Sequence, residues 1–147
     1  MGVCTDVVWR AFKEAGYSLR YMVDYDVRLR PGSYPNITKP DDNIDFRRVV
    51  NLKVFFDEYA VSLTLDPNEI DGWQGGDIVI FANSKGRPQH IGVISDRRTK
   101  EGVAYVLHNG GQEDREEDFL FDMTIIGHYR FDASKLPEEL LIPWEGN

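Results

Sequence analysis

The stretch QHIGVISDRRTKEGVAYVLHNGG, residues 89–111, decides the fold and holds two of the chain's three histidines. Two short apolar runs flank a charged loop, and such runs between turn signals are typical of β-strands. A hairpin centred on Thr99 places His90 directly opposite His108, because opposed residue numbers in an antiparallel pair have a constant sum. The two imidazoles are then expected on one face, with Cβ atoms on the order of 5 Å apart.

The two faces of this hairpin are expected to differ. The same register pairs Ile94 with Ala104, and it places Gly92 and Ala104 on the histidine face, where small side chains leave room for a helix. The opposite face carries Ile91, Val93, Tyr105 and Leu107. We therefore expect a helix to approach the histidine face.

Residues 4–19, CTDVVWRAFKEAGYSL, are expected to form that helix. The i, i+3, i+4 spacing of its small and apolar residues predicts one buried face. That face consists of Cys4, Val7, Val8, Ala11, Phe12 and Ala15. A thiol at a helix N-terminus is biased toward the thiolate by the local positive potential, and more so beside an imidazolium.

Together these side chains make the set that nucleophilic catalysis requires. Cys4 would attack, His90 would accept and return the proton, and His108 would orient His90. The backbone N–H of Cys4 is the natural donor to an oxyanion. Taken singly, a buried cysteine is usually an inert small hydrophobe, and a strand histidine is usually structural, as we expect of His128. Cys4 and the histidines lack the close spacing of metal ligands, so neither a metal nor another cofactor is predicted.

The remaining segments place helices before strands. Residues 24–44 are rich in turn signals and are expected to form a loop, and residues 45–59 are expected to form a second helix. The tail, residues 136–147, is expected to dock through leucines and Trp144. The predicted strands are residues 77–82, 90–95, 103–109 and 123–131. Helices followed by at least four strands with short connections predict an α+β domain with an antiparallel sheet.

Length and composition limit the classes of protein to which this chain can belong. The 147 residues suffice for one core, and we expect a single domain over residues 1–147. The net charge of −8 disfavours nucleic-acid binding, which needs clustered Lys and Arg. No apolar run reaches the length of a membrane span, and we recognise no signal peptide. A single cysteine excludes an intramolecular disulfide.

The order of these motifs resembles the NlpC-type superfamily of papain-like cell-wall peptidases. In that pattern a cysteine opens a helix, and a strand of the form GD-hydrophobic-hydrophobic-F precedes two strands that carry histidines. Here the motifs read CTDVVWRAFKEAG, GGDIVIF, HIGVIS and YVLHN. Within the superfamily the chain looks most like a bacterial family called domain of unknown function 1287. That likeness rests on GVCTDVVWRAFKEAGY, DDNIDFRRVVNLKVFF, WQGGDIV, HIGVIS, LHNGG and GHYRF.

The resemblance implies a papain-like fold, with N-terminal helices packed on an antiparallel β-sheet, and a Cys–His–His site at Cys4, His90 and His108. It also implies a periplasmic or extracellular role at the cell envelope, commonly cleavage of amide bonds in peptidoglycan peptides. Two alternatives stay open: acyl transfer by a toxin-like enzyme, and a catalytically inactive wall-binding module. Members of the superfamily usually carry structure before the cysteine that helps to line the groove, whereas three residues precede Cys4 here. Either the groove is more open or an upstream segment is missing.

The segment DDNIDFRRVVN has no counterpart in typical NlpC-type enzymes. Its polar residues are Asn43, Asp45, Arg47, Arg48 and Asn51. One interpretation is a network of helix caps and surface ion pairs. The other is recognition of a carboxylate on the peptidoglycan stem peptide, because arginine pairs with carboxylates in a bidentate manner. The predicted substrate-binding set is Asn43, Asp45, Arg47, Arg48 and Asn109.

Overall fold

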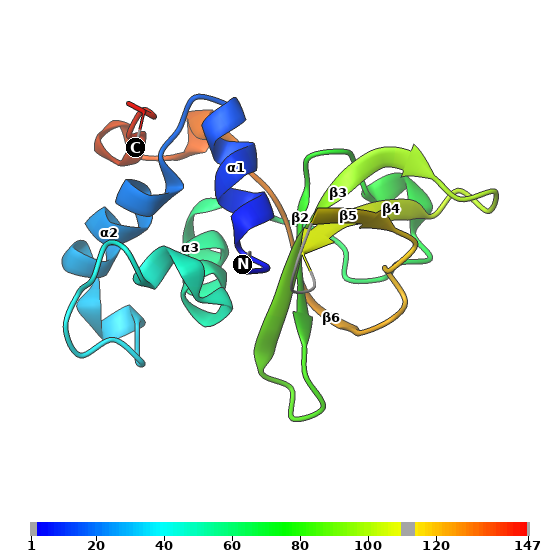
Figure 1. Ribbon diagram of the computed structural model, residues 1–147, viewed down its shortest axis with the longest axis horizontal. Coiled ribbons are helices and arrows are strands. Elements are labelled where there is room, and N and C mark those ends of the chain that lie inside the picture. The colour runs from blue at the N-terminus through cyan, green and yellow to red at the C-terminus, as the bar shows by residue number, and fades with distance from the viewer. Residues whose placement is uncertain (1–2, 110–113, 147) are drawn as a thin grey trace.

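The computed structural model describes residues 3–109 and 114–146, and in this part of the chain three α-helices pack on a six-stranded sheet. The helices gather on one side of the molecule and the strands on the other (Figure 1). The helices are α1 (Asp6–Glu14), α2 (Leu19–Leu29) and α3 (Val49–Tyr59). The strands are β1 (Val61–Ser62), β2 (Ile78–Ala82), β3 (Pro88–Arg98), β4 (Ala104–Asn109), β5 (Asp114–Glu117) and β6 (Thr124–Arg130).

The sheet has the strand order β1-β6-β2-β3-β4-β5, and every pairing between these strands is antiparallel. All five residues of β2 are buried, as expected for a central strand covered on both faces. The α+β prediction, with N-terminal helices on an antiparallel sheet, is therefore confirmed. None of the helices described here has the length and apolar character needed to cross a bilayer.

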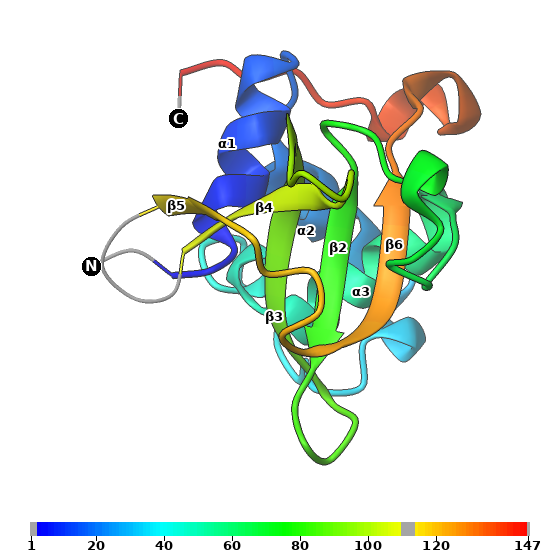
Figure 2. The same cartoon turned by 90° about the vertical axis from the view of Figure 1, so that its right-hand side faces the viewer.

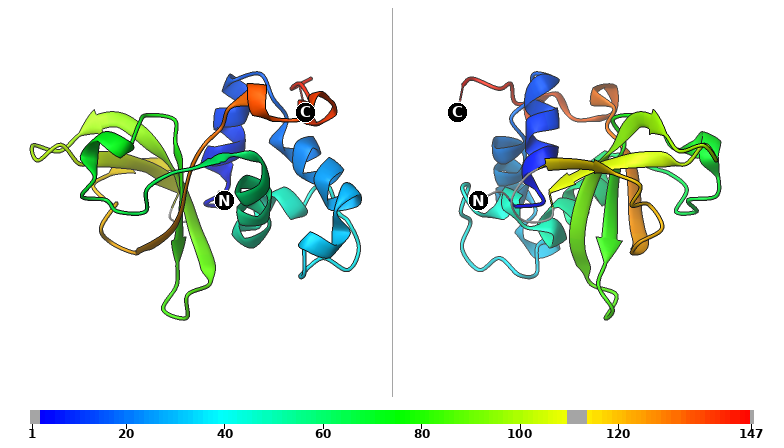
Figure 3. Two further views of the ribbon diagram at one scale, coloured as in Figure 1. Left: turned by 180° about the vertical axis from the view of Figure 1, so that it is seen from behind. Right: turned by 45° about the vertical axis from the view of Figure 1, so that its right-hand side comes forward.

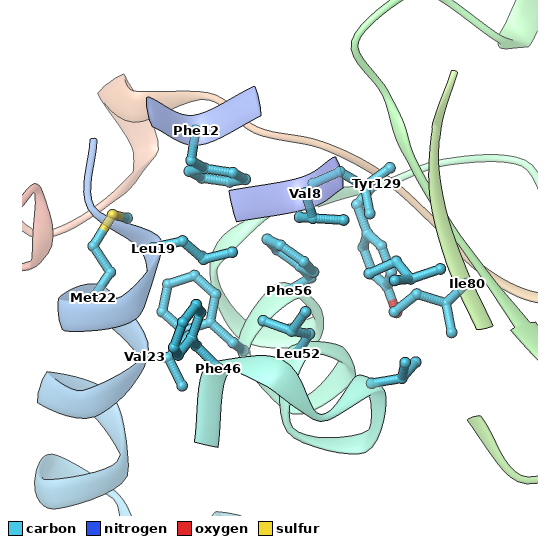
Figure 4. Close-up of a cluster of buried hydrophobic side chains, with 14 of the residues drawn as sticks. Val8, Phe12, Leu19, Met22, Val23, Phe46, Leu52, Phe56, Ile80 and Tyr129 are labelled. Carbon is cyan, nitrogen blue, oxygen red and sulfur yellow. The ribbon is translucent and has the colours of Figure 1, made fainter. Parts of the chain in front are cut away.

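The larger of two apolar clusters lies between the helices and the sheet, and we call it the helix-side core. Ile91 and Val93 of β3 face it, and Leu107 of β4 packs against its edge. Figure 4 shows its centre, where side chains from all three helices meet the sheet. The residues labelled there are Val8, Phe12, Leu19, Met22, Val23, Phe46, Leu52, Phe56, Ile80 and Tyr129.

The second cluster, the outer core, lies on the opposite face of the sheet. The segment between β5 and β6 crosses this face, as the views from the side and from behind show (Figures 2 and 3). Leu120 from that segment is buried in the cluster, and Phe119 packs against it. The buried members are Trp73, Val79, Phe81, Ile94, Ala104, Val106 and Leu120.

Helix α2 occupies part of the segment that was expected to be a loop, so the prediction for residues 24–29 is wrong. The physical reason is Asp26, a fully buried carboxylate that interrupts the apolar pattern. Burial alone would raise the pKa of Asp26, but hydrogen bonds from Arg30, Tyr34 and Tyr59 outweigh it and lower the pKa. A polar residue that looks exposed in the sequence thus joins α2 to α3.

The predicted helix over residues 45–59 is confirmed only in its second part. A 3₁₀ turn covers Asp45–Arg47, Arg48 is extended with φ −105° and ψ 125°, and α3 begins at Val49. The C-terminal tail docks as expected, because Leu140 is buried and Trp144 stacks on Trp9 with ring centroids 5.9 Å apart.

The β3–β4 hairpin has a different register from the predicted one. Ile94 pairs with Val106, whereas the expected hairpin pairs it with Ala104. The turn, in which Gly102 has a positive φ, pairs Arg98 with Ala104, four residues from the predicted register, and an irregularity between Ile94 and Arg98 reduces this offset to two residues. Because side chains alternate with a period of two, this shift leaves each residue on its original face.

We expect Phe56→Ala to lower the free energy of unfolding by about 3–5 kcal/mol, because it leaves a cavity in the helix-side core. Phe121→Ala is the matched control, since that ring is 53% exposed, and its effect should stay within about 0.5 kcal/mol. Urea denaturation of both variants measures the difference. Equal losses would contradict the assignment of Phe56 to the centre of the core.

Candidate active site

The two histidines of the hairpin lie on the outer face of the sheet and touch. His90 Nε2 lies 2.7 Å from His108 Nδ1, and the rings meet edge to face with centroids 4.9 Å apart. They are not directly opposed as predicted, since a Cβ placed on Gly92 would lie 3.4 Å from the Cβ of His108. The two rings therefore meet diagonally across the strands, which long side chains can do.

A third group completes this chain of hydrogen bonds. His108 is buried, and its Nε2 lies 2.8 Å from Oε1 of Glu117 on β5. Phe119 covers both imidazoles, with its ring centroid 5.5 Å from His90 and 4.3 Å from His108. The histidine pair is thus bound by Glu117 of β5 and covered by Phe119 from the segment that follows β5.

The sequence analysis identified neither Glu117 nor Phe119. Glu117 belongs to the acidic run EDREED, which has no apolar alternation and looks like a solvated loop. It forms an exposed edge strand only because β4 supplies the pairing, with Val106 opposite Glu117. One feature of the sequence could have pointed to Glu117: the acidic run follows shortly after the predicted strand that carries His108.

Cys4 lies in the turn that precedes α1, beside the edge of β3. Its thiol makes a weak contact of 4.0 Å with the carbonyl oxygen of Gln89, and the backbone N–H of Ile91 also interacts with the sulfur. Among the residues that the structure describes, the paired part of β3 and β4 ends at Val93. The main-chain groups on both sides of His90 therefore face the thiol instead of a neighbouring strand.

The helix approaches the sheet from the side opposite to the one predicted. Val7 and Val8 of α1 pack in the helix-side core with Ile91 and Val93, whereas the histidine rings lie on the outer face. The predicted space beside Gly92 is filled from within the sheet, because a Cβ there would lie 2.6 Å from a methyl group of Val106. The thiol lies at the strand edge, and its hydrogen bond goes to Gln89 rather than to either imidazole.

The local electrostatics favour a neutral thiol and a neutral imidazole. Burial raises the pKa of Cys4; backbone N–H groups of Ile91, Cys4 and Thr5 oppose the rise, and the charge of Asp6 adds to it. Desolvation and the carboxylate of Asp6 thus oppose the predicted bias of the Cys4 thiol toward the thiolate. Burial, followed by the charge of His108, lowers the pKa of His90 to about 4.

The polar segment before α3 is divided between two roles. Asp45 is buried and accepts a hydrogen bond from the N–H of Asp41, and its carbonyl accepts one from Asn51. Asn43 is exposed, and its carbonyl accepts a hydrogen bond from Nε of Arg47. Asp45 and Asn51 thus make contacts within the segment itself, and recognition stays a prediction for Asn43, Arg47 and Arg48.

The two arginines differ in their contacts. The carbonyl of Arg47 accepts a hydrogen bond from the hydroxyl of Thr5, the residue after Cys4, at 3.2 Å. Its guanidinium lies 3.6 Å from Asp6. Arg48 is exposed, and within residues 3–109 and 114–146 its guanidinium has no hydrogen bond or ion pair. It is therefore available to an anionic ligand.

The last predicted substrate-binding residue, Asn109, is buried and donates from Nδ2 to Asp114 at 3.0 Å. It links the end of β4 to the start of β5, next to the histidine pair. Two residues that carried the family resemblance after it, Gly110 and Gly111, lie outside the described residues, as does Gly2.

His128 lies in a separate buried cluster on β6. Its ring nitrogens lie 2.7 Å from the carbonyl of Thr64 and 2.7 Å from Asp77, which also pairs with Arg130. Its ring stacks on Trp73 at 3.6 Å between centroids. These contacts fix the start of β2 to β6. In the part of the chain that the structure describes, no group of three or more His, Cys, Asp or Glu side chains is arranged to hold a metal ion.

We expect alkylation of Cys4 by iodoacetamide to be slow near pH 6 and to rise with a midpoint above about 8.5, the ordinary value for a cysteine. The reason is that burial raises the pKa of the thiol. Rates measured from pH 5 to 10 give the midpoint. Fast labelling that does not change below pH 7 would show a preformed thiolate–imidazolium pair instead.

The lowered pKa of His90 also links stability to pH. Between about pH 6.5, the ordinary value for a histidine, and about 4, the unfolded chain binds a proton at this position that the folded protein does not. Stability should therefore fall as the pH is lowered through this window. His90→Gln should make that fall smaller, as measured by urea denaturation at several pH values. An unchanged pH dependence in the variant would mean that His90 titrates normally.

Comparison with known proteins assigns the family. The chain is 39% identical over 133 residues to "Uncharacterized protein YijF" of Escherichia coli (strain K12), an alignment that covers 88% of this chain and 64% of that protein. The match thus spans less than two thirds of the relative's length. No solved structure matches the chain. A family model described as "Domain of unknown function (DUF1287)" matches residues 1–131, and the chain therefore belongs to the DUF1287 family.

Proposed function

We propose that this chain is a cysteine amidohydrolase or endopeptidase with a papain-like, NlpC-type fold, which cleaves amide bonds of peptidoglycan peptides. The observation that carries the proposal is the His90–His108 hydrogen bond of 2.7 Å next to the strand edge that holds Cys4. A nucleophile, a base and a group that orients the base are then present in one region. The resemblance of the motifs to cell-wall peptidases supplies the substrate class.

In the proposed reaction, His90 accepts the proton of the Cys4 thiol as the sulfur attacks the carbonyl carbon of the substrate. Backbone N–H groups around the sulfur, including that of Cys4, stabilise the oxyanion of the tetrahedral intermediate. His90 returns the proton to the leaving amine, and an acyl-enzyme forms. Water, activated by His90, then releases the acyl group and restores the thiol.

The neutral thiol and imidazole favour general-base catalysis over a preformed ion pair. Burial keeps the proton on Cys4 and keeps His90 unprotonated above about pH 4. His90 is then in the basic form that proton abstraction needs at neutral pH. The thiol needs to ionise only as it attacks, when the developing cation is stabilised by His108 and Glu117.

A second candidate is a wall-binding module without catalysis. It is favoured by the raised pKa of Cys4 and by the contact of the thiol with Gln89 rather than with a histidine. A toxin-like acyltransferase would use the same three residues and differ only in the acceptor of the acyl group. Under any of these proposals, we place the protein in the periplasm or outside the cell, because that is where peptidoglycan lies.

Digestion of purified sacculi separates these functions. We expect the wild type to release muropeptides, and Cys4→Ala to lose activity on the order of 10³-fold or more, because the nucleophile is absent. Mass spectrometry of the products identifies the bond that is cut. Binding to sacculi without release of products, by both proteins, would support the inactive module. Products that carry an added amine or alcohol would support acyl transfer.

The free guanidinium of Arg48 is our candidate for binding a carboxylate of the stem peptide. A charge-assisted hydrogen bond contributes about 1.5–3 kcal/mol, so Arg48→Gln should lower kcat/KM by about 10- to 100-fold. Arg87→Gln is the matched control, because Arg87 is an exposed arginine in the turn between β2 and β3. If substrates with an amidated carboxyl group show the same loss, the carboxylate is not the group that Arg48 binds.

A further inference from the structure

Glu117 is the last member of a chain of hydrogen bonds whose direction can be deduced from chemistry. An ionised carboxylate has acceptors and no donor. The contact of 2.8 Å between Glu117 Oε1 and His108 Nε2 therefore requires the proton on Nε2 of His108. Which nitrogen of a histidine carries the proton is thus set by its neighbour.

The same reasoning extends to His90. A neutral His108 with its proton on Nε2 has an unprotonated Nδ1, which can only accept. Its partner at 2.7 Å, Nε2 of His90, must therefore be the donor. A neutral His90 with its proton on Nε2 keeps its lone pair on Nδ1.

Nδ1 is the ring nitrogen that can act as the base. Within residues 3–109 and 114–146 it has no hydrogen-bond partner, whereas Nε2 is occupied by His108. It is also the ring nitrogen closer to its own main chain, and the sulfur of Cys4 lies against the main chain on both sides of His90.

We propose that Glu117 is a positioning residue that fixes the tautomers of both histidines, so that the lone pair of His90 Nδ1 is the one available to the thiol of Cys4. The opposite direction would require a donor at residue 117 or a doubly protonated His108, and in either case it would leave a proton on Nδ1 of His90, where it blocks the transfer. The catalytic consequence rests on the function proposed above, but the tautomers do not.

The proton balance of the relay is simple. In the attack step one proton moves from the Cys4 sulfur to His90 Nδ1, and His90 becomes a cation with a proton on each nitrogen. Its Nε2–H still donates to His108, whose Nε2–H still donates to Glu117. No second proton has to move, and the carboxylate stabilises the cation through the neutral ring between them.

Long-range ¹H–¹⁵N correlation spectra of histidine side chains test this proposal, because they distinguish protonated from unprotonated ring nitrogens. The three signals are assigned by substituting each histidine in turn. At neutral pH we expect His90 and His108 of the wild type to carry their protons on Nε2. In Glu117→Ala, the ratio of the two tautomers of His108 should fall by about tenfold or more, because a charge-assisted hydrogen bond is lost.

Two further variants keep the test informative. Glu117→Gln retains an acceptor, so it should preserve the wild-type tautomers more fully than alanine does. Asp118→Asn removes the same charge from an exposed neighbouring residue and should leave both tautomers unchanged. A protonated Nδ1 on His90 in the wild type, or identical tautomer ratios in wild type and Glu117→Ala, would overturn the proposal.

The outcome is separable from that of the proposed function. If the histidines show the expected tautomers but the protein releases no product from sacculi, the proposal for Glu117 holds and the proposed hydrolase activity does not. Cys4-dependent cleavage with the proton of His90 on Nδ1 would do the reverse. If cleavage is seen, Glu117→Ala should lower kcat more than it raises KM, because the carboxylate acts on the base rather than on bound substrate.

Discussion

The divergence of β4 from β3 beyond Val93 is the constraint on which the site depends. Up to that residue the two strands pair and place both histidines on one face. Beyond it, the carbonyl of Gln89 and the N–H of Ile91 interact with the thiol of Cys4, and β4 supplies no paired residue for them within residues 3–109 and 114–146. The strand edge thus holds the N-terminal turn through the main-chain groups that would otherwise pair with a neighbouring strand.

The histidine pair could be predicted from the sequence even though its register could not. A hairpin shifted by an even number of residues keeps every side chain on its face, so His90 and His108 stay within reach of each other. The register is set by the position of the turn and by the irregularity between Ile94 and Arg98, and neither has a mark in the sequence beyond polar residues near the turn. The helix approaches the opposite face because Ile91 and Val93 offer it more apolar area than Gly92 does.

The sequence-based predictions also failed for charged residues whose surroundings differ from those that the sequence suggests. Asp26 interrupts the apolar pattern of α2, yet it is buried because Arg30, Tyr34 and Tyr59 satisfy it. Glu117 lies in an acidic run, and the sequence of that run does not distinguish a solvated carboxylate from a functional one. In both cases the partner that decides the role is brought close only by the tertiary structure. Asp45 is the converse, since a candidate for recognition is buried and accepts a hydrogen bond from the N–H of Asp41 in its own segment.

The thiol and the histidine relay compete for a single proton, and this competition decides whether the site can work as a catalyst. In the structure the thiol contacts the carbonyl of Gln89, an acceptor that is neutral and cannot take the proton. The lone pair that Glu117 assigns to His90 Nδ1 is an acceptor that can. In the proposed reaction, the thiol of Cys4 would leave the first acceptor for the second, and a half-buried cysteine would become an activated nucleophile. Substrate that displaces water from the strand edge would favour this change, because the N–H groups around the sulfur then stabilise a thiolate in a drier surrounding. The raised pKa of the resting thiol is therefore compatible with catalysis, provided that binding and activation are coupled.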